Sequence, residues 1–148
     1  MNEKIYLLAK RVRDKILENK NYKSIKVWDT GWDHFPNGCC DKASEVLLKY
    51  LGDNWLEWFY YKRKEWSYLW KDYSHVWLEN DKIALDITIS QFNWKWSWIV
   101  FQEIQLIPKE SYFFNKIDWE YYEYDPIFMK KSDVSYYDYI WFYDKFIN

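Results

Sequence analysis

Apolar and polar residues alternate in two short runs near the middle of the chain, and a period of two is typical of β-strands. In residues 75–79 the second and fourth positions are aliphatic, and in residues 83–88 the first, third and fifth are. The polar pair Asn80-Asp81 between the runs suits a tight turn. The pattern therefore predicts an antiparallel hairpin.

The predicted hairpin brings together a histidine and an aspartate, two residue types that are common in active sites. If Asn80 and Asp81 form the loop, His75 lies directly opposite Asp86. Directly opposed residues share one face of a sheet, with Cβ atoms about 5 Å apart. At that distance an aspartate can hold one imidazole nitrogen and fix the tautomer of the other. A histidine held in this way can activate a nucleophile, so the hairpin predicts a nucleophile elsewhere in the chain.

Helical periodicity occurs in two other segments. Apolar residues three and four apart predict an amphipathic helix from about Glu3 to Asn19. A second helical pattern begins near Cys40, directly after a turn sequence at residues 35–38. Gly52-Asp53-Asn54 is expected to end this helix, with glycine in the usual stop position. One face of this second helix is predicted to contain Cys40, Ala43, Leu47 and Leu51.

Cys40 lies in the first turn of the second predicted helix, where the positive end of the helix dipole stabilises a thiolate. Free cysteines are also commonly small buried hydrophobic residues, and the cysteines by themselves leave this interpretation of Cys39 and Cys40 open. The hairpin favours the reactive interpretation, because His75 and Asp86 are the partners that a catalytic thiol needs.

Further segments complete the predicted fold. We expect a short strand at residues 24–28, a strand with tryptophans at alternate positions from residue 94 towards Ile107, and a helix after residue 132. Helices segregated from an antiparallel sheet make an α+β fold. A chain of 148 residues is long enough for one full core, so residues 1–148 are expected to form a single domain.

Composition narrows the functional classes. The formal net charge is -2, which gives no electrostatic argument for nucleic acid. No apolar stretch approaches membrane-spanning length, and the N-terminal segment lacks the pattern of a signal peptide. The adjacent Cys39 and Cys40 cannot form an ordinary disulfide. We therefore expect a reduced, cytoplasmic protein with no membrane or nucleic-acid partner.

The cysteine, histidine and aspartate lie in motifs that occur in a familiar order: Gly38-x-Cys40 opening a helix, His75-x-Trp77, and Leu85-Asp86-Ile87-Thr88. Together they resemble the transglutaminase-like branch of the papain-like cysteine fold. A narrower resemblance, over residues 35–92, is to small uncharacterised bacterial proteins with FPxGxC, SHxWLE and DITxxQF motifs. The resemblance implies a papain-like α+β core in which a cysteine-bearing helix packs on an antiparallel sheet.

The same resemblance implies a role for each residue of the triad. Cys40 would be the nucleophile, His75 the general base and acid, and Asp86 the residue that orients the histidine. We choose Cys40 over Cys39 because the Gly-x-Cys spacing and Ser44, four residues later, then both match the motif.

The remaining candidate residues would bind the oxyanion or the substrate. Papain-like enzymes combine the backbone N–H of the cysteine with a nearby side chain. His34 and Asn37 are the local options, although His34 also fits an exposed turn residue. Gln91 follows the aspartate and is either a cleft residue or a polar strand end. Trp77 shares the strand face of His75 and is predicted to shield it from water, whereas most other aromatic residues are expected to form the core.

The sequence thus predicts a cofactor-free cysteine hydrolase or acyltransferase that acts on an amide, ester or isopeptide bond through a thioester. Its substrate would be a peptide, a protein or a small acyl compound. One alternative is a catalytically silent binding module with an aromatic-lined cleft for a peptide or partner protein. A metal site built from Cys39, Cys40, His34 and His75 is disfavoured, because adjacent cysteines do not match the spaced pairs of zinc sites.

Overall fold

The computed structural model describes residues 1–21, 32–68, 70–93, 99–116 and 143–147. The strand expected at residues 24–28, the tryptophan run at 94–98 and nearly all of the helix expected after residue 132 lie outside these residues.

The described chain consists of helices and one antiparallel sheet, so the predicted α+β class is confirmed. The sheet has four strands in the order β1-β2-β3-β4. No helix in the described ranges is long and apolar enough to span a bilayer. In chain order the elements are α1 (Asn2–Asn19), α2 (Cys40–Asp53), β1 (Tyr60–Tyr68), β2 (Lys71–Glu79), β3 (Ile83–Asp86), the 3₁₀ turn η1 (Ile89–Phe92), β4 (Gln105–Pro108), the 3₁₀ turn η2 (Lys109–Ser111), the short α3 (Phe113–Lys116) and the π-helical turn η4 (Tyr143–Ile147).

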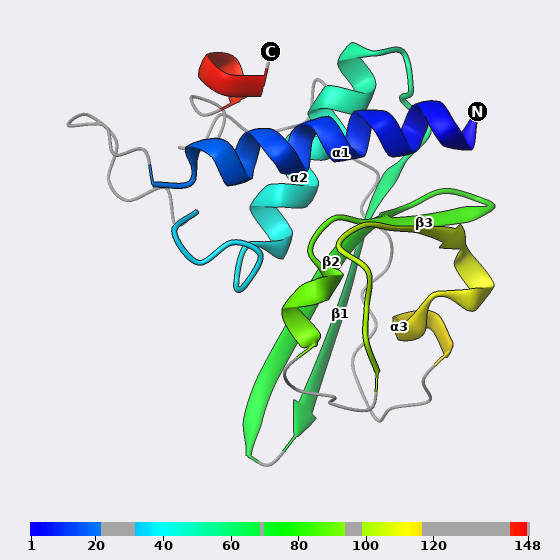
Figure 1. Cartoon of the computed structure of the whole chain (residues 1–148). Helices are drawn as coiled ribbons and strands as arrows, with labels where there is room; N and C mark the ends of the chain where they lie inside the picture. The colour runs from blue at the N-terminus through cyan, green and yellow to red at the C-terminus, as the bar shows by residue number, and fades with distance from the viewer. Residues whose placement is uncertain (22–31, 69, 94–98, 117–142, 148) are drawn as a thin grey trace.

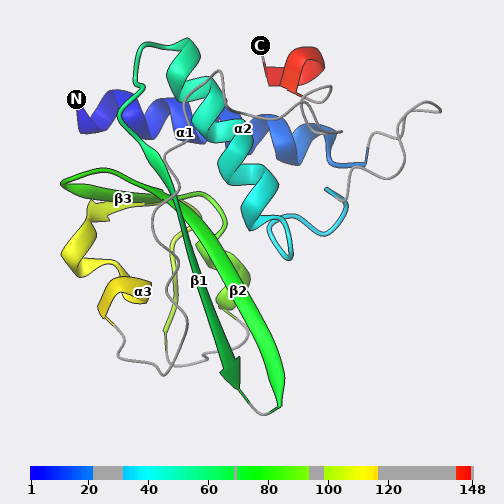
Figure 2. The same ribbon diagram turned by 180° about the vertical axis from the view of Figure 1, so that it is seen from behind.

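The sheet separates two cores. Helices α1 and α2 pack together beside the sheet, and α3 lies on the side away from them (Figures 1 and 2). Alternate residues of β2 enter different cores, as a period of two requires. Val76 and Leu78 pack with the helices. Trp77 packs with Phe92, Tyr112 and Phe114 in an aromatic core on the opposite face.

The β2–β3 hairpin is formed, but its predicted register is wrong by two residues. Leu78 pairs with Leu85, and Glu79 pairs with Ala84. The reason lies in Asn80, whose side-chain oxygen accepts hydrogen bonds from the backbone N–H groups of Lys82 and Ile83, both at 2.9 Å. Such an Asx turn moves the loop one residue along the chain. A shift of two in the pairing keeps every side chain on its predicted face.

The chain leaves the sheet directly after Asp86, so the second strand of the hairpin is two residues shorter than the alternating pattern at residues 83–88 predicts. Residues Ile89–Phe92 then form the turn η1, which doubles the chain back beside β2. The strand expected to run from residue 94 towards Ile107 is wrong for residues 99–104, which are irregular, and among the described residues only the last part of the prediction is a strand. That part is β4, whose Leu106 pairs with Leu85 of β3.

Helix α2 ends at Asp53, within the segment Gly52-Asp53-Asn54 that is predicted to end it, although Gly52 itself is still helical. The N–H of Leu56 donates to the carbonyl of Leu51 at 2.9 Å, and the N–H of Trp55 donates to that of Gly52 at 3.0 Å. These two bonds define a Schellman motif, in which the residue at the position of Trp55 must be left-handed. Trp55 accordingly has φ of 66°, a conformation that usually selects glycine, and its side chain is 84% exposed.

We expect Trp55→Gly to raise the free energy of unfolding by about 1 kcal/mol, because glycine adopts the left-handed conformation without steric cost. Urea denaturation measures the change. Trp58→Gly is the matched control, since this neighbouring exposed tryptophan does not have positive φ and its replacement should destabilise the protein. A loss of stability in Trp55→Gly would show that contacts of the indole outweigh the backbone strain.

Candidate active site

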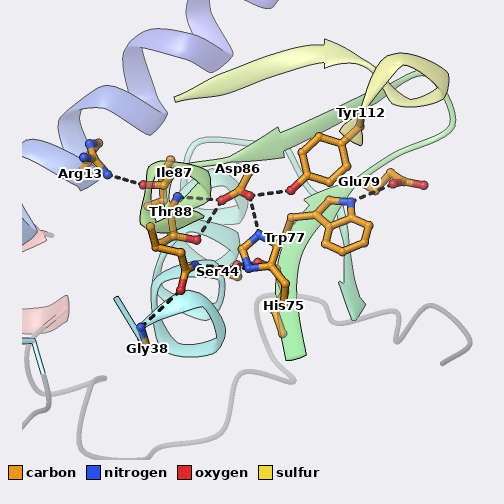
Figure 3. Close-up of polar contacts among 12 residues, drawn as sticks. Arg13, Gly38, Ser44, His75, Trp77, Glu79, Asp86, Ile87, Thr88 and Tyr112 are labelled. Carbon is orange, nitrogen blue, oxygen red and sulfur yellow. Dashed lines mark hydrogen bonds and ion pairs between the residues drawn. The ribbon is translucent and has the colours of Figure 1, made fainter. Parts of the chain in front are cut away.

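His75 and Asp86 form a buried pair, as the hairpin pattern predicted. Nε2 of His75 lies 2.6 Å from Oδ2 of Asp86 (Figure 3). The two residues are not directly opposed, because the register is shifted, but they stay diagonal neighbours on one face of the sheet. The aspartate therefore holds one nitrogen of the imidazole and leaves Nδ1 for another partner.

Four donors surround the Asp86 carboxylate. Oδ1 accepts the backbone N–H of Thr88 at 2.7 Å and its hydroxyl at 2.9 Å. Oδ2 accepts the hydroxyl of Tyr112 at 2.6 Å in addition to the imidazole. Burial would by itself raise the pKa of Asp86, but His75 and the hydrogen bonds from Tyr112 and Thr88 hold it below the ordinary value. The carboxylate is thus ionised although it is inside the protein.

Aromatic rings enclose His75, which has no exposed surface. The indole of Trp77 is stacked on the imidazole at 5.8 Å between ring centroids, and the rings of Phe92 and Phe114 lie at 4.9 and 4.8 Å. Burial favours the neutral imidazole, but Asp86 and Cys40 outweigh it and raise the pKa of His75 to about 9. The indole of Trp77 thus covers one side of the imidazole.

Cys40 is the first residue of α2 and reaches His75 because this helix packs against β2, the strand that carries His75. A hydrogen bond with the Cys40 side chain contributes to the raised pKa of His75. The hydroxyl of Ser44, one turn further along α2, donates to the carbonyl of Val76 at 3.4 Å. Ser44 thus joins the helix to the backbone of β2 next to His75. The spacing of four residues in the motif places Ser44 one helical turn after Cys40, on the side of α2 that faces β2.

The two adjacent cysteines have different surroundings. The Cys39 thiol has no exposed surface and contacts the backbone oxygen of Asn37 at 3.3 Å. Burial raises the pKa of Cys39 to about 11, so its thiol stays protonated at neutral pH. Cys40 is 8% exposed and contacts the histidine. Neither cysteine is in a disulfide. This difference supports the choice of Cys40 as the reactive thiol.

Of the oxyanion and substrate candidates, the structure brings Gln91 to the triad. Its Nε2 lies 3.3 Å from Nδ1 of His75, and its Oε1 accepts the backbone N–H of Gly38 at 3.3 Å. Gly38 has φ of 66°, so the turn before Cys40 uses a conformation that favours glycine. The side chains of His34 and Asn37 are exposed. His34 therefore fits the alternative interpretation as an exposed turn residue.

The sequence interpretation missed three residues that support the site. Thr88 carried a signal, since a threonine two residues after an aspartate commonly forms a local hydrogen bond with it. Tyr112 carried none, because it is 26 residues from Asp86 and outside the motifs. Arg13 of α1 is buried and donates from Nη1 to the carbonyl of Ile87, and its guanidinium lies over the ring of Phe35 at 5.1 Å. It joins the first helix to the chain between Asp86 and Thr88.

Comparison of the chain with protein-family models, with curated proteins and with solved structures finds no match. Within the part of the chain that the structure describes, no group of three or more histidine, cysteine and acidic side chains is placed to hold a metal ion.

Proposed function

We propose that the protein is a cysteine-dependent hydrolase or acyltransferase with a papain-like, transglutaminase-like core, acting on an amide, ester or isopeptide bond. The observation that carries the proposal is the buried chain Cys40–His75–Asp86, in which a histidine is held by a carboxylate at 2.6 Å and contacts a thiol at the start of a helix. This order of nucleophile, base and orienting acid is the arrangement that cysteine and serine hydrolases share.

The first half of the reaction would form a thioester. Nδ1 of His75 takes the proton of the Cys40 thiol, and the sulfur attacks the substrate carbonyl carbon. The oxyanion that forms accepts hydrogen bonds from the backbone N–H of Cys40, which has no partner inside the helix, and from Nε2 of Gln91. His75 then gives its proton to the leaving amine or alcohol, and the carbon–heteroatom bond breaks.

The second half would release the acyl group. Water or an amine gives a proton to Nδ1 of His75 and attacks the thioester carbonyl. The Cys40 sulfur leaves and takes the proton back from His75. Water as the attacking group gives hydrolysis, and an amine gives acyl transfer.

A silent binding module is the second candidate, because the site is strongly buried. His75 has no exposed surface and Cys40 has 8%. The aromatic rings around His75 pack against one another in the core. A peptide or protein would then bind the outer surface near the helix start while the thiol, histidine and aspartate only stabilise the fold.

Acylation by an activated ester separates the two functions. We expect p-nitrophenyl acetate to add one acetyl group to the wild-type protein, with intact-mass spectrometry and peptide mapping placing it on Cys40. Cys40→Ala should abolish this labelling, and Cys39→Ser, the matched control next to it, should retain it. Labelling of Cys39 alone would overturn the choice of nucleophile. Absence of labelling on both thiols of the folded protein would favour the binding module.

A further inference from the structure

We propose that Tyr112 sets the proton affinity of His75 by sharing with it the carboxylate oxygen of Asp86. The inference rests on the proposed function for its meaning, since the proton affinity of His75 matters for catalysis only if this residue is the general base and acid. The tyrosine touches neither the thiol nor the substrate position. It is therefore a positioning residue that acts through the aspartate.

The geometry shows two strong donors on one oxygen. The Tyr112 hydroxyl and Nε2 of His75 each lie 2.6 Å from Oδ2 of Asp86 (Figure 3). Both bonds of Thr88 go to the other oxygen, Oδ1. Tyr112 is fully buried, and its ring packs on Trp77 at 4.9 Å between centroids. The hydroxyl is thus held in place by the aromatic core.

Sharing an acceptor weakens each bond to it. A donor that binds Oδ2 draws negative charge from that oxygen, so the carboxylate stabilises the imidazolium of His75 less than an unshared carboxylate would. A general acid is most effective when its pKa lies near the working pH. Asp86 and Cys40 already raise the pKa of His75 to about 9. Tyr112 counteracts that rise, which leaves an imidazolium able to protonate a leaving group.

Other charged groups face the pair from each neighbouring element. Cys40 of α2 contacts His75 directly. Lys64 of β1 is paired with His75 in the sheet, and its buried ammonium donates to the carbonyl of Phe114 at 2.7 Å. The charge of Arg13 of α1 acts on Asp86.

The carboxylate of Glu79 on β2 acts on Tyr112 and accepts the indole N–H of Trp77. Replacing Tyr112 by phenylalanine keeps its ring in the core and removes none of these groups.

The decisive measurement is the titration of the His75 imidazole by NMR, without substrate, in the full chain. The chain has two histidines, and the exposed His34 serves as an internal reference. We expect Tyr112→Phe to raise the pKa of His75 by roughly one unit, as loss of a hydrogen bond to a charged group implies. An unchanged or lowered pKa of His75 would overturn the inference. A purely structural Tyr112 would lower the melting temperature and leave the titration in place.

Tyr143→Phe is the matched control, because the buried hydroxyl of Tyr143 donates to the carboxylate of Asp53, remote from the triad in the chain. Its loss should leave the titration of His75 unchanged. If Tyr112→Phe does not fold, 3-fluorotyrosine placed at position 112 keeps the ring and strengthens the donor, and it should lower the pKa of His75. These titrations need no activity, so failure of the inference and failure of the proposed function are distinguishable. If the function is wrong, acylation is absent although the pKa of His75 shifts in Tyr112→Phe. If the inference is wrong, acylation is present although the pKa of His75 does not shift.

Discussion

Asp86→Asn is expected to lower the rate of Cys40 acylation per folded molecule by roughly 10³- to 10⁴-fold. The asparagine oxygen would keep the hydrogen bonds from Thr88, whose two donors lie at 2.7 and 2.9 Å from Oδ1 of the aspartate. Its NH₂ group would then take the position of Oδ2 and donate to Nε2 of His75. The imidazole would carry its proton on Nδ1, the nitrogen that has to accept the proton of Cys40. The variant would hold the histidine in the wrong tautomer. The measurement is the rate of acetylation by p-nitrophenyl acetate.

Stability measured on the same sample separates catalysis from structure. Removing one partner of a buried ion pair costs about 3 kcal/mol, so Asp86→Asn should melt at a lower temperature but remain folded under the assay conditions. Asp53→Asn is the matched control, since it also removes a carboxylate that binds a buried tyrosine and should leave acylation unchanged. A large loss of stability with acylation preserved in the folded fraction would reject the catalytic role of Asp86.

The stability difference between wild type and Asp86→Asn should also depend on pH. The pKa of Asp86 is lowered from 3.8, so its contribution is present above that value and is lost as the pH falls through the folded-state pKa. The pKa of His75 is raised from 6.5 to about 9, so its contribution is full below 6.5 and is lost as the pH rises through 9. The difference should therefore be largest between those ordinary values, near pH 5, and should shrink towards pH 9.

His75→Ala is expected to slow the alkylation of Cys40 by iodoacetamide at pH 6.5 by up to about 100-fold. In the wild type, His75 is protonated below a pKa of about 9, and the imidazolium stabilises a thiolate beside it. For comparison, the thiol of a model peptide with no cation beside it is only about 1% ionised at that pH. Rates measured from pH 5 to 10 would show the reactive range moving upward in the variant.

Two controls accompany this experiment. His34→Ala replaces the other histidine, whose side chain is exposed, and should leave the rate unchanged. His75→Gln keeps a donor for the buried Asp86 while removing the charge, and it should react as slowly as His75→Ala. Equal, slow alkylation of both thiols in the wild type would contradict the activated thiolate and favour the binding module.

The residues of the hairpin and of α2 illustrate what the sequence by itself determines. Side-chain alternation along a strand and the helical repeat follow from backbone dihedral angles, so the pattern of apolar residues places His75 and Asp86 on one face and Cys40 at a helix start. Both placements are present in the structure. The observed register of β2 and β3 differs by two residues from the predicted one. His75 and Asp86 nevertheless lie on the same face, because side chains alternate with a period of two.

Turn chemistry and helix ends were harder to predict. The Asx turn at Asn80 and the left-handed Trp55 each depend on a few hydrogen bonds. Competing conformations of such short segments differ by about 1 kcal/mol. The common residue preferences favour a two-residue turn at Asn80-Asp81 and a glycine, not a tryptophan, at the left-handed position. The end of α2 falls within the predicted segment Gly52-Asp53-Asn54, but the left-handed residue that follows the helix is Trp55 and not the glycine.

Contacts between distant segments were decided only by the tertiary structure. Tyr112 reaches Asp86, Ser44 reaches the carbonyl of Val76, and Gln91 reaches Gly38 across 53 residues. No local repeat encodes these distances, because each depends on how the sheet packs between the helices and the aromatic core. The sequence alone determined which residue types share a face and where the thiol begins its helix. The packing of α2 against β2 decided that thiol, histidine and carboxylate meet, since only non-local burial brings the helix start to the strand.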